Sequence, residues 1–312
     1  MTRRTHDDVL ELQIGPLAYR LVAHDDAAGR RLAELRAAAD CEPPAPGTLT
    51  RTVHLLEMRL SGDEYRTMNA HRLPERLRLS TRGSAHAGDL PRNDWRLAAD
   101  ETGVLTWWHD GCDAAFLTLD TVPHVDEARL LFPWTLVVRD VTAAGGAVAH
   151  AALARRSSQA VALTAPPDGG KSTAAARLQS PWMALADDAC LVWFDAGRIR
   201  ASALPTWGVA IGASPQPAAI PVWRLHDVVD LTAVMVLEKA RRDRIESLAE
   251  IDALRVLYRA FSEHPSVCDE RRDLRDHLFA VAARLAESLP VFRLELTLTG
   301  RFRPLIERAL SA

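Results

Sequence analysis

Residues 161–188 read VALTAPPDGGKSTAAARLQSPWMALADD, and this stretch decides the fold of the second part of the chain. A short apolar run, residues 161–164, meets a turn rich in proline and glycine, and Lys171 then opens an alanine-rich helical pattern. A strand, a glycine turn and a helix start in this order aim backbone N–H groups at an anion, while lysine and serine serve phosphate and Mg²⁺. The stretch therefore predicts a phosphate-binding loop in an α/β domain.

The end of this loop supplies the candidate nucleotide-binding residues. They are Asp168, Gly169, Gly170, Lys171, Ser172 and Thr173. The usual phosphate-loop pattern begins with glycine, whereas this chain has Ala165 there, followed by Pro166 and Pro167. We expect these three residues to alter the first turn of the loop, and to affect its affinity for a nucleotide more than its identity as a phosphate site.

Lysine is almost absent from this chain. Of the 38 basic residues, only Lys171 and Lys239 are lysine. A lysine after Gly170 therefore stands out, because a compact ammonium group can be enclosed by a phosphate loop and the planar guanidinium of arginine does not replace it. Lys239 has no role in this interpretation, and we expect it to lie on the surface as most lysines do.

Two adjacent carboxylates, Asp187 and Asp188, begin sixteen residues after Lys171. Such a pair in isolation is usually an acidic turn. One strand beyond a phosphate loop, one carboxylate can hold Mg²⁺ together with Ser172 and the other can accept a hydroxyl proton, the two tasks of phosphoryl transfer. His150, on the strand predicted before the loop, is either a partly buried strand histidine or a group that contacts the phosphate or the acids.

Arginines crowd the end of a long apolar run, residues 228–238, which is predicted to be a buried central strand. Either this is a solvated basic turn, or one arginine neutralises charge that develops on a transferred phosphoryl group. Arg241 and Arg244 are therefore candidate catalytic residues. The chain has no spacing typical of a hydrolytic triad or a zinc site.

Composition excludes several other classes of protein. With 48% hydrophobic and 25% charged residues, the sequence predicts a soluble globular protein, and its net charge of -3 argues against nucleic acid or anionic lipid as a partner. No apolar run approaches the roughly 20 residues of a membrane span, and the N-terminus lacks the apolar core of a secretory signal. Four widely spaced cysteines favour free thiols in a reducing cytoplasm.

The chain is predicted to form two domains, α/β in class and α+β overall. Residues 1–125 are expected to form a small mixed α+β domain, with a helix at residues 27–39 and a hairpin across Asp110 and Gly111. Residues 126–312 are expected to hold the phosphate loop, and Pro133 to start or bend a helix.

Several of these segments together resemble a known family. His150, PPDGGKST (166–173), LADDACLVW (185–193) and LPTWG (204–208) are similar to the HPr kinase-like P-loop family. The stretch RLQSPWMALADDACLVW (177–193) is especially similar to the ScmC proteins of SynChlorMet peptide-modification cassettes. The similarity covers roughly residues 125–300, with Ala165 as a departure from it.

This resemblance implies a fold shared with phosphoenolpyruvate carboxykinases and the use of ATP and Mg²⁺ to phosphorylate a serine. It implies that Gly170, Lys171 and Ser172 hold the triphosphate and metal. It also implies that His150 and Asp187 lie at the reacting phosphoryl group, Asp187 as base, with Asp188 nearer the metal. Relatives in peptide cassettes are linked to ribosomally made peptides, and the family resemblance suggests self-association.

Three functions remain open from the sequence. The first is an ATP- and Mg²⁺-dependent kinase of a peptide or protein hydroxyl, with the N-terminal domain presenting the substrate. The second is a nucleotide-binding protein of reduced activity that regulates or scaffolds a peptide-modifying enzyme. The third is a small-molecule kinase. The altered start of the loop favours the second, whereas the lysine, serine and acid pair favour catalysis.

Overall fold

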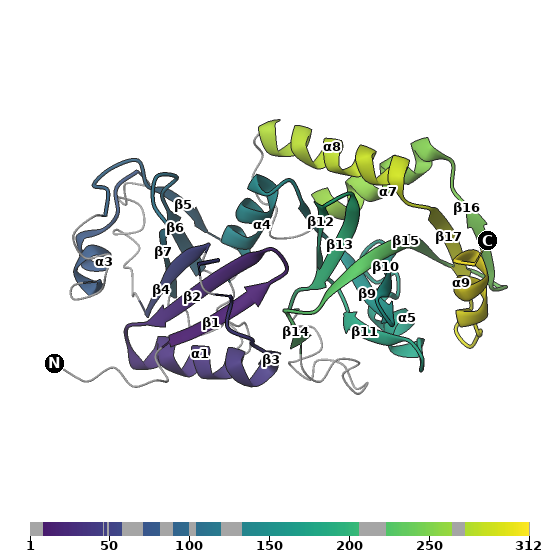
Figure 1. Ribbon diagram of the computed structural model, residues 1–312, viewed down its shortest axis with the longest axis horizontal. Helices are drawn as coiled ribbons and strands as arrows, with labels where there is room; N and C mark the ends of the chain where they lie inside the picture. The colour runs from purple at the N-terminus through teal and green to yellow at the C-terminus, as the bar shows by residue number, and fades with distance from the viewer. Residues whose placement is uncertain are drawn as a thin grey trace. The chain divides into compact units, whose positions relative to one another are not determined.

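The computed structural model describes residues 9–45, 47–48, 50–57, 71–81, 90–99, 104–119, 133–205, 223–263 and 272–311. The chain divides into two compact units, Met1–Val137 and Val138–Ala312, each with a sheet of its own (Figure 1). The predicted α/β class, α+β overall, is confirmed. The domain boundary predicted at residue 125 falls outside the described residues.

The first unit is built on a six-stranded sheet in the order β1-β2-β4-β7-β6-β5. Its strands are β1 (Val9–Ile14), β2 (Leu17–Ala23), β4 (Arg51–Glu57), β5 (Arg96–Ala99), β6 (Val104–Trp108) and β7 (Ala114–Leu119). The hairpin predicted across Asp110 and Gly111 is confirmed, because β6 and β7 pair antiparallel on either side of it. Strand β4 pairs parallel with both β2 and β7, so the sheet is mixed.

Helix α1 (Asp26–Ala38) confirms the helix predicted at residues 27–39. Its N-cap, Asp25, accepts a hydrogen bond of 2.8 Å from the backbone N–H of Ala28, and Leu32 and Leu35 are buried on one helix face. A second core gathers large aromatic side chains around Trp95 and Trp107, together with Leu77 of α3 (Glu75–Ser80). The short strand β3 (Ala39–Asp40) follows α1.

The second unit carries a nine-stranded sheet whose main path is β11-β9-β10-β15-β13-β12-β8, with β17 pairing with β15 and β16. These strands are β8 (Ala147–Ala149), β9 (Ala151–Arg156), β10 (Gln159–Thr164), β11 (Met183–Ala186), β12 (Cys190–Asp195), β13 (Arg198–Ala203), β15 (Val228–Lys239), β16 (Arg244–Ser247) and β17 (Val291–Leu296). Strand β14 (Trp223–Arg224) is short. The long buried strand predicted at residues 228–238 is confirmed as β15, which pairs with β10, β13 and β17.

Successive side chains of β10 point to opposite faces of the sheet, and each face has its own core. Val161 and Leu163 pack with α5 (Lys171–Arg177) on one face. Ala160 and Ala162 pack on the other face with α7 (Glu250–Ser262) and α8 (Arg272–Ser288), which lie side by side (Figure 1). The loop after β10 therefore begins at the end of a central strand whose two faces are both covered by helices.

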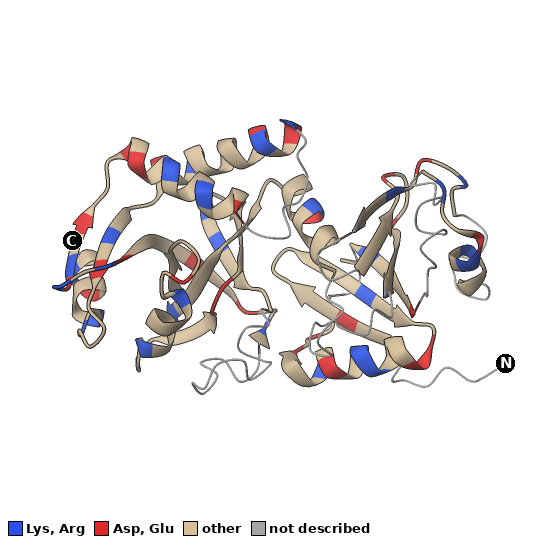
Figure 2. Ribbon diagram, turned by 180° about the vertical axis from the view of Figure 1, so that it is seen from behind, with Lys and Arg blue, Asp and Glu red and all other residues tan. Residues whose placement is uncertain are grey.

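Two further helices complete the described fold. Helix α4 (Trp134–Ala143) begins directly after Pro133, as predicted, and α9 (Arg303–Ala309) packs its buried Ile306 into the core that contains α5. None of the described helices is long and apolar enough to span a membrane. Acidic and basic residues are interspersed along α1 and α8, in keeping with the small net charge (Figure 2).

Cys41, Cys112 and Cys190 are free thiols, and Cys268 lies outside the described residues. Burial raises the pKa of the Cys190 thiol to about 12 and that of Cys41 to about 11. Both thiols are therefore protonated at neutral pH, and neither has the lowered pKa of a reactive cysteine.

Candidate phosphate site

The loop between β10 and α5 contains two glycines that are required for different reasons. Gly170 has φ +95°, a left-handed conformation that side chains other than glycine rarely adopt. Gly169 is required for space, because a Cβ atom there would lie 2.5 Å from the Cβ of Ala165 and 2.8 Å from the carbonyl oxygen of Pro166. The Gly169 N–H donates to that same Pro166 carbonyl at 2.9 Å, which closes the first turn of the loop.

Ala165, which stands where a glycine is usual, is accommodated by Gly169. Ala165 is 8% exposed and belongs to the core beneath α5. Its methyl group occupies space that a side chain at position 169 would otherwise need. The alanine and the glycine four residues later are therefore a matched pair, and the loop closes with the methyl in place.

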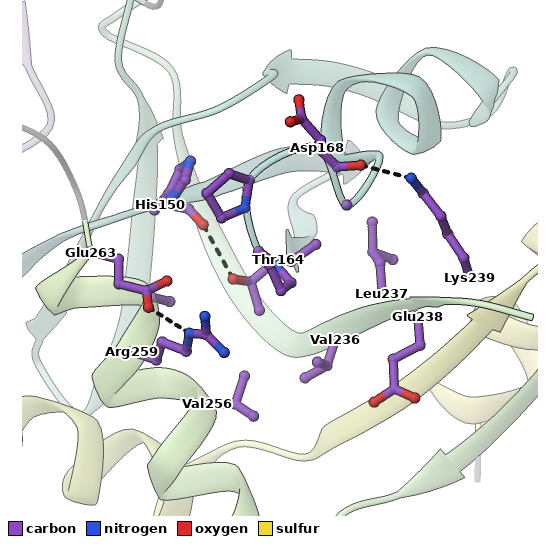
Figure 3. A pocket seen from close by; sticks show the side chains of 15 residues that line it. His150, Thr164, Asp168, Val236, Leu237, Glu238, Lys239, Val256, Arg259 and Glu263 are labelled. Atoms are coloured by element: carbon purple, nitrogen blue, oxygen red, sulfur yellow. Dashed lines mark hydrogen bonds and ion pairs between the residues drawn. The ribbon is translucent and has the colours of Figure 1, made fainter.

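The two lysines of the chain both bond to this loop. Lys171 Nζ donates to the carbonyl of Ala165 at 3.3 Å, and Lys239 Nζ donates to the carbonyl of Asp168 at 2.9 Å (Figure 3). Lys239 lies at the exposed end of β15. We expected only a surface lysine there, and the scarcity of lysine was the sequence signal that could have assigned it to the loop.

The acid pair follows β11 and meets the loop through Asp188. The Oδ1 atom of Asp188 lies 3.3 Å from Lys171 Nζ and 3.1 Å from His150 Nε2. Lys171 is only 5% exposed, so this carboxylate balances a nearly buried positive charge. Asp187 is 2% exposed, and its backbone carbonyl accepts a 3.3 Å hydrogen bond from Ser172 Oγ.

His150 is held from two sides between β8 and β9. Its backbone N–H donates to the carbonyl of Ala260 in α7 at 2.8 Å, and its own carbonyl accepts from Thr164 Oγ1 at 3.2 Å. Since Thr164 is the last residue of β10, the histidine and the start of the loop are tied together. The fold thus brings His150, Lys171, Ser172, Asp187 and Asp188 to one sheet edge.

The pKa of Asp188 reflects competing effects. Burial alone would raise it, but the hydrogen bond and charge of His150 and the charge of Lys171 outweigh burial and hold the pKa of this carboxyl below its ordinary value. Asp188 is therefore ionised at neutral pH. An anionic oxygen beside a lysine ammonium suits a site where phosphate and a cation meet.

Ser172 and Asp188 carry oxygen atoms of the kind that Mg²⁺ prefers as ligands. Within the described ranges, there is no group of three or more His, Cys, Asp or Glu side chains that could hold a metal by itself. Mg²⁺ is commonly held by one or two carboxylates, substrate phosphates and water, and does not need a cage made entirely of protein. The hydroxyl of Ser172 and the carboxylate of Asp188 are donors of that kind.

The remaining predicted site residues are not part of the cluster around Asp188. Thr173 is exposed in the first turn of α5, and Asp168 has φ 57°. Arg241 is exposed between β15 and β16, and Arg244 is exposed at the first residue of β16, where its Nη2 pairs with Glu246 Oε2 at 2.8 Å. Among the described contacts, none joins either arginine to the acid pair. Trp207 of the LPTWG segment lies outside the described residues.

A pocket of about 510 Å³ opens beside the loop (Figure 3). One wall is residues 164–169, which include Pro166 and Pro167. The second wall is residues 236–239 at the end of β15, and the third is α7 with Val256, Arg259 and Ala260, followed by its C-cap residue Glu263. His150 also lines the pocket, so the cavity borders the cluster around Asp188.

Comparisons with known proteins extend these observations. Residues 124–311 match the family model described as SynChlorMet cassette protein ScmC, which covers more than half of the chain and confirms that resemblance. A search of curated proteins gives no significant match. Among solved structures, the chain is similar to the Hpr(Ser) kinase/phosphatase from Coxiella burnetii, with 14% identity, a TM-score of 0.29, and coverage of 53% of this chain and 87% of that one.

Proposed function

Because this chain belongs to the ScmC family of SynChlorMet cassette proteins, we propose that it is a phosphotransferase that uses ATP and Mg²⁺ and acts on a hydroxyl group of a peptide or protein. The observation that carries this proposal is the joint contact of Lys171 and His150 with one oxygen of Asp188, at 3.3 Å and 3.1 Å, directly beside a glycine loop. Phosphoryl transfer needs a phosphate-binding cation, a metal-binding carboxylate and a proton acceptor in one place.

In this proposal the loop amides and Lys171 bind the phosphates of ATP, with Gly169, Gly170 and Thr173 shaping the loop. Ser172 and Asp188 would hold Mg²⁺, which when bound supplies positive charge that neutralises the phosphate oxygens. His150 orients Asp188 through the 3.1 Å contact. Asp187 accepts the proton of the substrate hydroxyl, whose oxygen forms a bond to the γ-phosphorus as the bond to ADP breaks.

The family description supports a role within a peptide-modification cassette, and the proposed substrate follows from it. The first unit, with its separate sheet, is proposed to present that peptide or to contact a modifying enzyme. Self-association of the chain is proposed on the resemblance alone.

A second candidate is a nucleotide-binding protein that regulates or scaffolds a modifying enzyme. The observation that favours it is the chemistry at the start of the loop, where Ala165 is followed by Pro166 and Pro167. Both candidates require nucleotide binding, and they differ in whether a phosphate is transferred.

The test is phosphate transfer from ATP with Mg²⁺ to candidate precursor peptides. Wild type is compared with Lys171→Ala, with Asp187→Asn and with the control Asp252→Asn, whose carboxylate lies on the first turn of α7. We expect Lys171→Ala to lose nucleotide binding and Asp187→Asn to lose turnover while it retains binding. Wild-type binding without transfer would favour the second candidate, and absence of binding would refute both.

A further inference from the structure

The two loops that follow β15 and β17 form a basic surface. Residues 240–244 contain three arginines and one aspartate, and residues 297–303 contain two arginines and no acid, whereas the whole chain has a net charge of -3. We propose that this surface binds an acidic segment of the peptide substrate and holds the peptide while its hydroxyl reacts. The inference rests on the proposed function and adds the chemical class of its substrate.

The basic surface and the phosphate loop lie at the same edge of the sheet. Strands β10, β15 and β17 run parallel, so their carboxyl ends, where ligands of α/β sheets usually bind, point the same way. The phosphate loop follows β10, and the two basic loops follow β15 and β17. Lys239, the last residue of β15, also reaches the carbonyl of Asp168 at 2.9 Å (Figure 3). A peptide at the phosphate site can therefore extend to the neighbouring strand ends.

Three of the five arginines are available to a partner. They are exposed and have no ion-pair partner in the described part of the chain, and they are Arg241, Arg242 and Arg301. The other two are engaged, since Arg244 Nη2 pairs with Glu246 Oε2 at 2.8 Å and Arg303 Nη1 donates to the carbonyl of Ser180 at 2.7 Å. Guanidinium groups bind carboxylates through two parallel hydrogen bonds, so the three exposed arginines suit an acidic peptide.

The carboxylate of Asp243 joins the two loops. Its Oδ1 accepts the N–H of Thr297 at 2.7 Å, and a Cβ atom on Gly300 would overlap the same carboxylate, so glycine is required there for space. The N–H of Ala240 donates to the carbonyl of Leu296 at 2.9 Å. The one acid in these loops is therefore bound to the backbone, and the contacts hold the two groups of arginines side by side.

Arg177 attaches the second loop to the helix that begins at the phosphate loop. Its Nη1 donates to the carbonyl of Thr297 at 3.1 Å and its Nη2 to that of Gly300, while its guanidinium lies 5.1 Å from the ring centre of Phe302. Arg177 ends α5, whose first residue is Lys171. The basic surface is thus fixed before a peptide arrives, which lowers the entropy cost of binding it.

An apolar side chain lies within the same surface. Leu298, in the loop after β17, is 94% exposed. A leucine this exposed gains by contact with an apolar side chain of a partner, because that contact removes its surface from water. The surface therefore fits a peptide segment in which acidic residues flank an apolar one.

Other anions fit this surface less well. None of its arginines lines the cavity beside the phosphate loop, so it lies outside that pocket. A nucleic acid is held by cations along a row of phosphates. Here β16 and β17 carry Glu246 and Glu295 close by, so the basic area is short (Figure 2).

The experiment measures peptide binding without nucleotide. Three fluorescent peptides share one sequence with a serine and a leucine and differ only in having glutamate, glutamine or lysine at the remaining positions. Fluorescence anisotropy gives their affinities. Arg242→Gln/Arg301→Gln removes two cations and leaves Arg241, a candidate catalytic residue, in place. The matched control Arg272→Gln/Arg275→Gln removes two exposed arginines of α8.

We expect the wild type to bind the glutamate peptide most tightly. Arg242→Gln/Arg301→Gln should weaken this binding by about fivefold, and the α8 control should not change it. Leu298→Ser should weaken it by about threefold. A wild type that does not distinguish the three peptides overturns the proposal, and so does an equal loss in the α8 control. An oligonucleotide of dT that binds more tightly than the glutamate peptide, and only when Arg242 and Arg301 are present, would identify a nucleic-acid surface instead.

Phosphate transfer from ATP to the glutamate peptide separates this inference from the proposed function. The peptide KM is expected to rise in Arg242→Gln/Arg301→Gln, while the KM for ATP stays unchanged. Transfer with an unchanged peptide KM refutes the basic surface alone. Peptide binding without any transfer refutes the proposed function and leaves the surface as a docking site for an acidic peptide. An unfolding midpoint in urea equal to that of the wild type reports that each variant is folded.

Discussion

The ammonium group of Lys239 donates a hydrogen bond of 2.9 Å to the backbone carbonyl of Asp168, which lies 71 residues earlier in the chain (Figure 3). Asp168 has φ 57°, in the left-handed region that is unfavourable for residues other than glycine. The end of β15 therefore stabilises an otherwise costly loop conformation. Together with the bond from Lys171 to Ala165, it fixes two carbonyls of the loop so that the loop is organised before a phosphate arrives.

Lys239→Met is expected to weaken nucleotide binding without a large change in stability. An exposed hydrogen bond of this kind contributes about 0.5–1.5 kcal/mol, so a loss of up to about tenfold in ATP affinity is expected. Calorimetric titration with ATP and Mg²⁺ measures it. Arg255→Met, which removes a cation whose side chain is 75% exposed on α7, is the control. Lys239→Arg should recover part of the affinity. Equal affinities for wild type and Lys239→Met would show that the loop does not depend on this contact.

Gly169→Ala is expected to distort the loop and abolish most nucleotide binding, because the new Cβ would lie 2.5 Å from the Cβ of Ala165 and 2.8 Å from the Pro166 oxygen. The double variant Ala165→Gly/Gly169→Ala removes the first of these clashes and keeps the second. Its affinity for ATP should therefore lie between those of the wild type and the single variant. If the double variant binds no better than Gly169→Ala, the methyl of Ala165 is not the cause of the constraint.

Local patterns were sufficient to predict many of the elements. The apolar run before Ala165, the glycines and the helical pattern after Lys171 predicted strand, loop and helix in the correct order, because each signal lies within a few residues. The Asp110-Gly111 hairpin and the buried strand β15 were predicted for the same reason.

Contacts between distant segments could not be predicted, since they depend on strand order. His150 and Asp188 are 38 residues apart, and they meet because β9 lies between β10 and β11 in the sheet. The same reason explains why Arg241 and Arg244 were candidates at the end of β15, although Lys239 is the residue bonded to the loop. The sequence indicated that basic residues gather at the end of β15. The pairing of β15 with β10 was needed to show that Lys239 is the side chain that reaches Asp168.

Leu163→Ala tests how firmly the core beneath the loop supports the fold. Leu163 is 0% exposed on β10 and packs on the same face as α5. A cavity at such a position costs about 2–5 kcal/mol of the free energy of unfolding. Leu298→Ala is the matched control, because Leu298 is 94% exposed and its truncation should change stability by less than about 0.5 kcal/mol. Urea unfolding measures both, and a loss for Leu163→Ala no larger than that of the control would contradict the described packing.

Lys171 and Asp188 should be energetically coupled in the absence of any ligand. Removing the carboxylate in Asp188→Asn leaves an ammonium that is 5% exposed without its partner, whereas Lys171→Met/Asp188→Asn removes both charges. The double variant is therefore expected to be more stable than the sum of the single effects predicts. Because the Asp188 side chain is 43% exposed, solvent screens the pair, and a coupling free energy of about 1 kcal/mol is expected.

The coupling should also depend on pH in a defined direction. The pKa of Asp188 is lowered in the fold from its ordinary 3.8, so the contribution of this carboxylate to stability is present above that value and is lost as the pH falls through the lowered pKa. Urea unfolding of wild type, both single variants and the double variant at pH 7 and at successively lower pH measures the cycle. Additive effects at pH 7, or a coupling that persists after Asp188 is protonated, would show that the 3.3 Å contact between Lys171 and Asp188 does not stabilise the ligand-free loop.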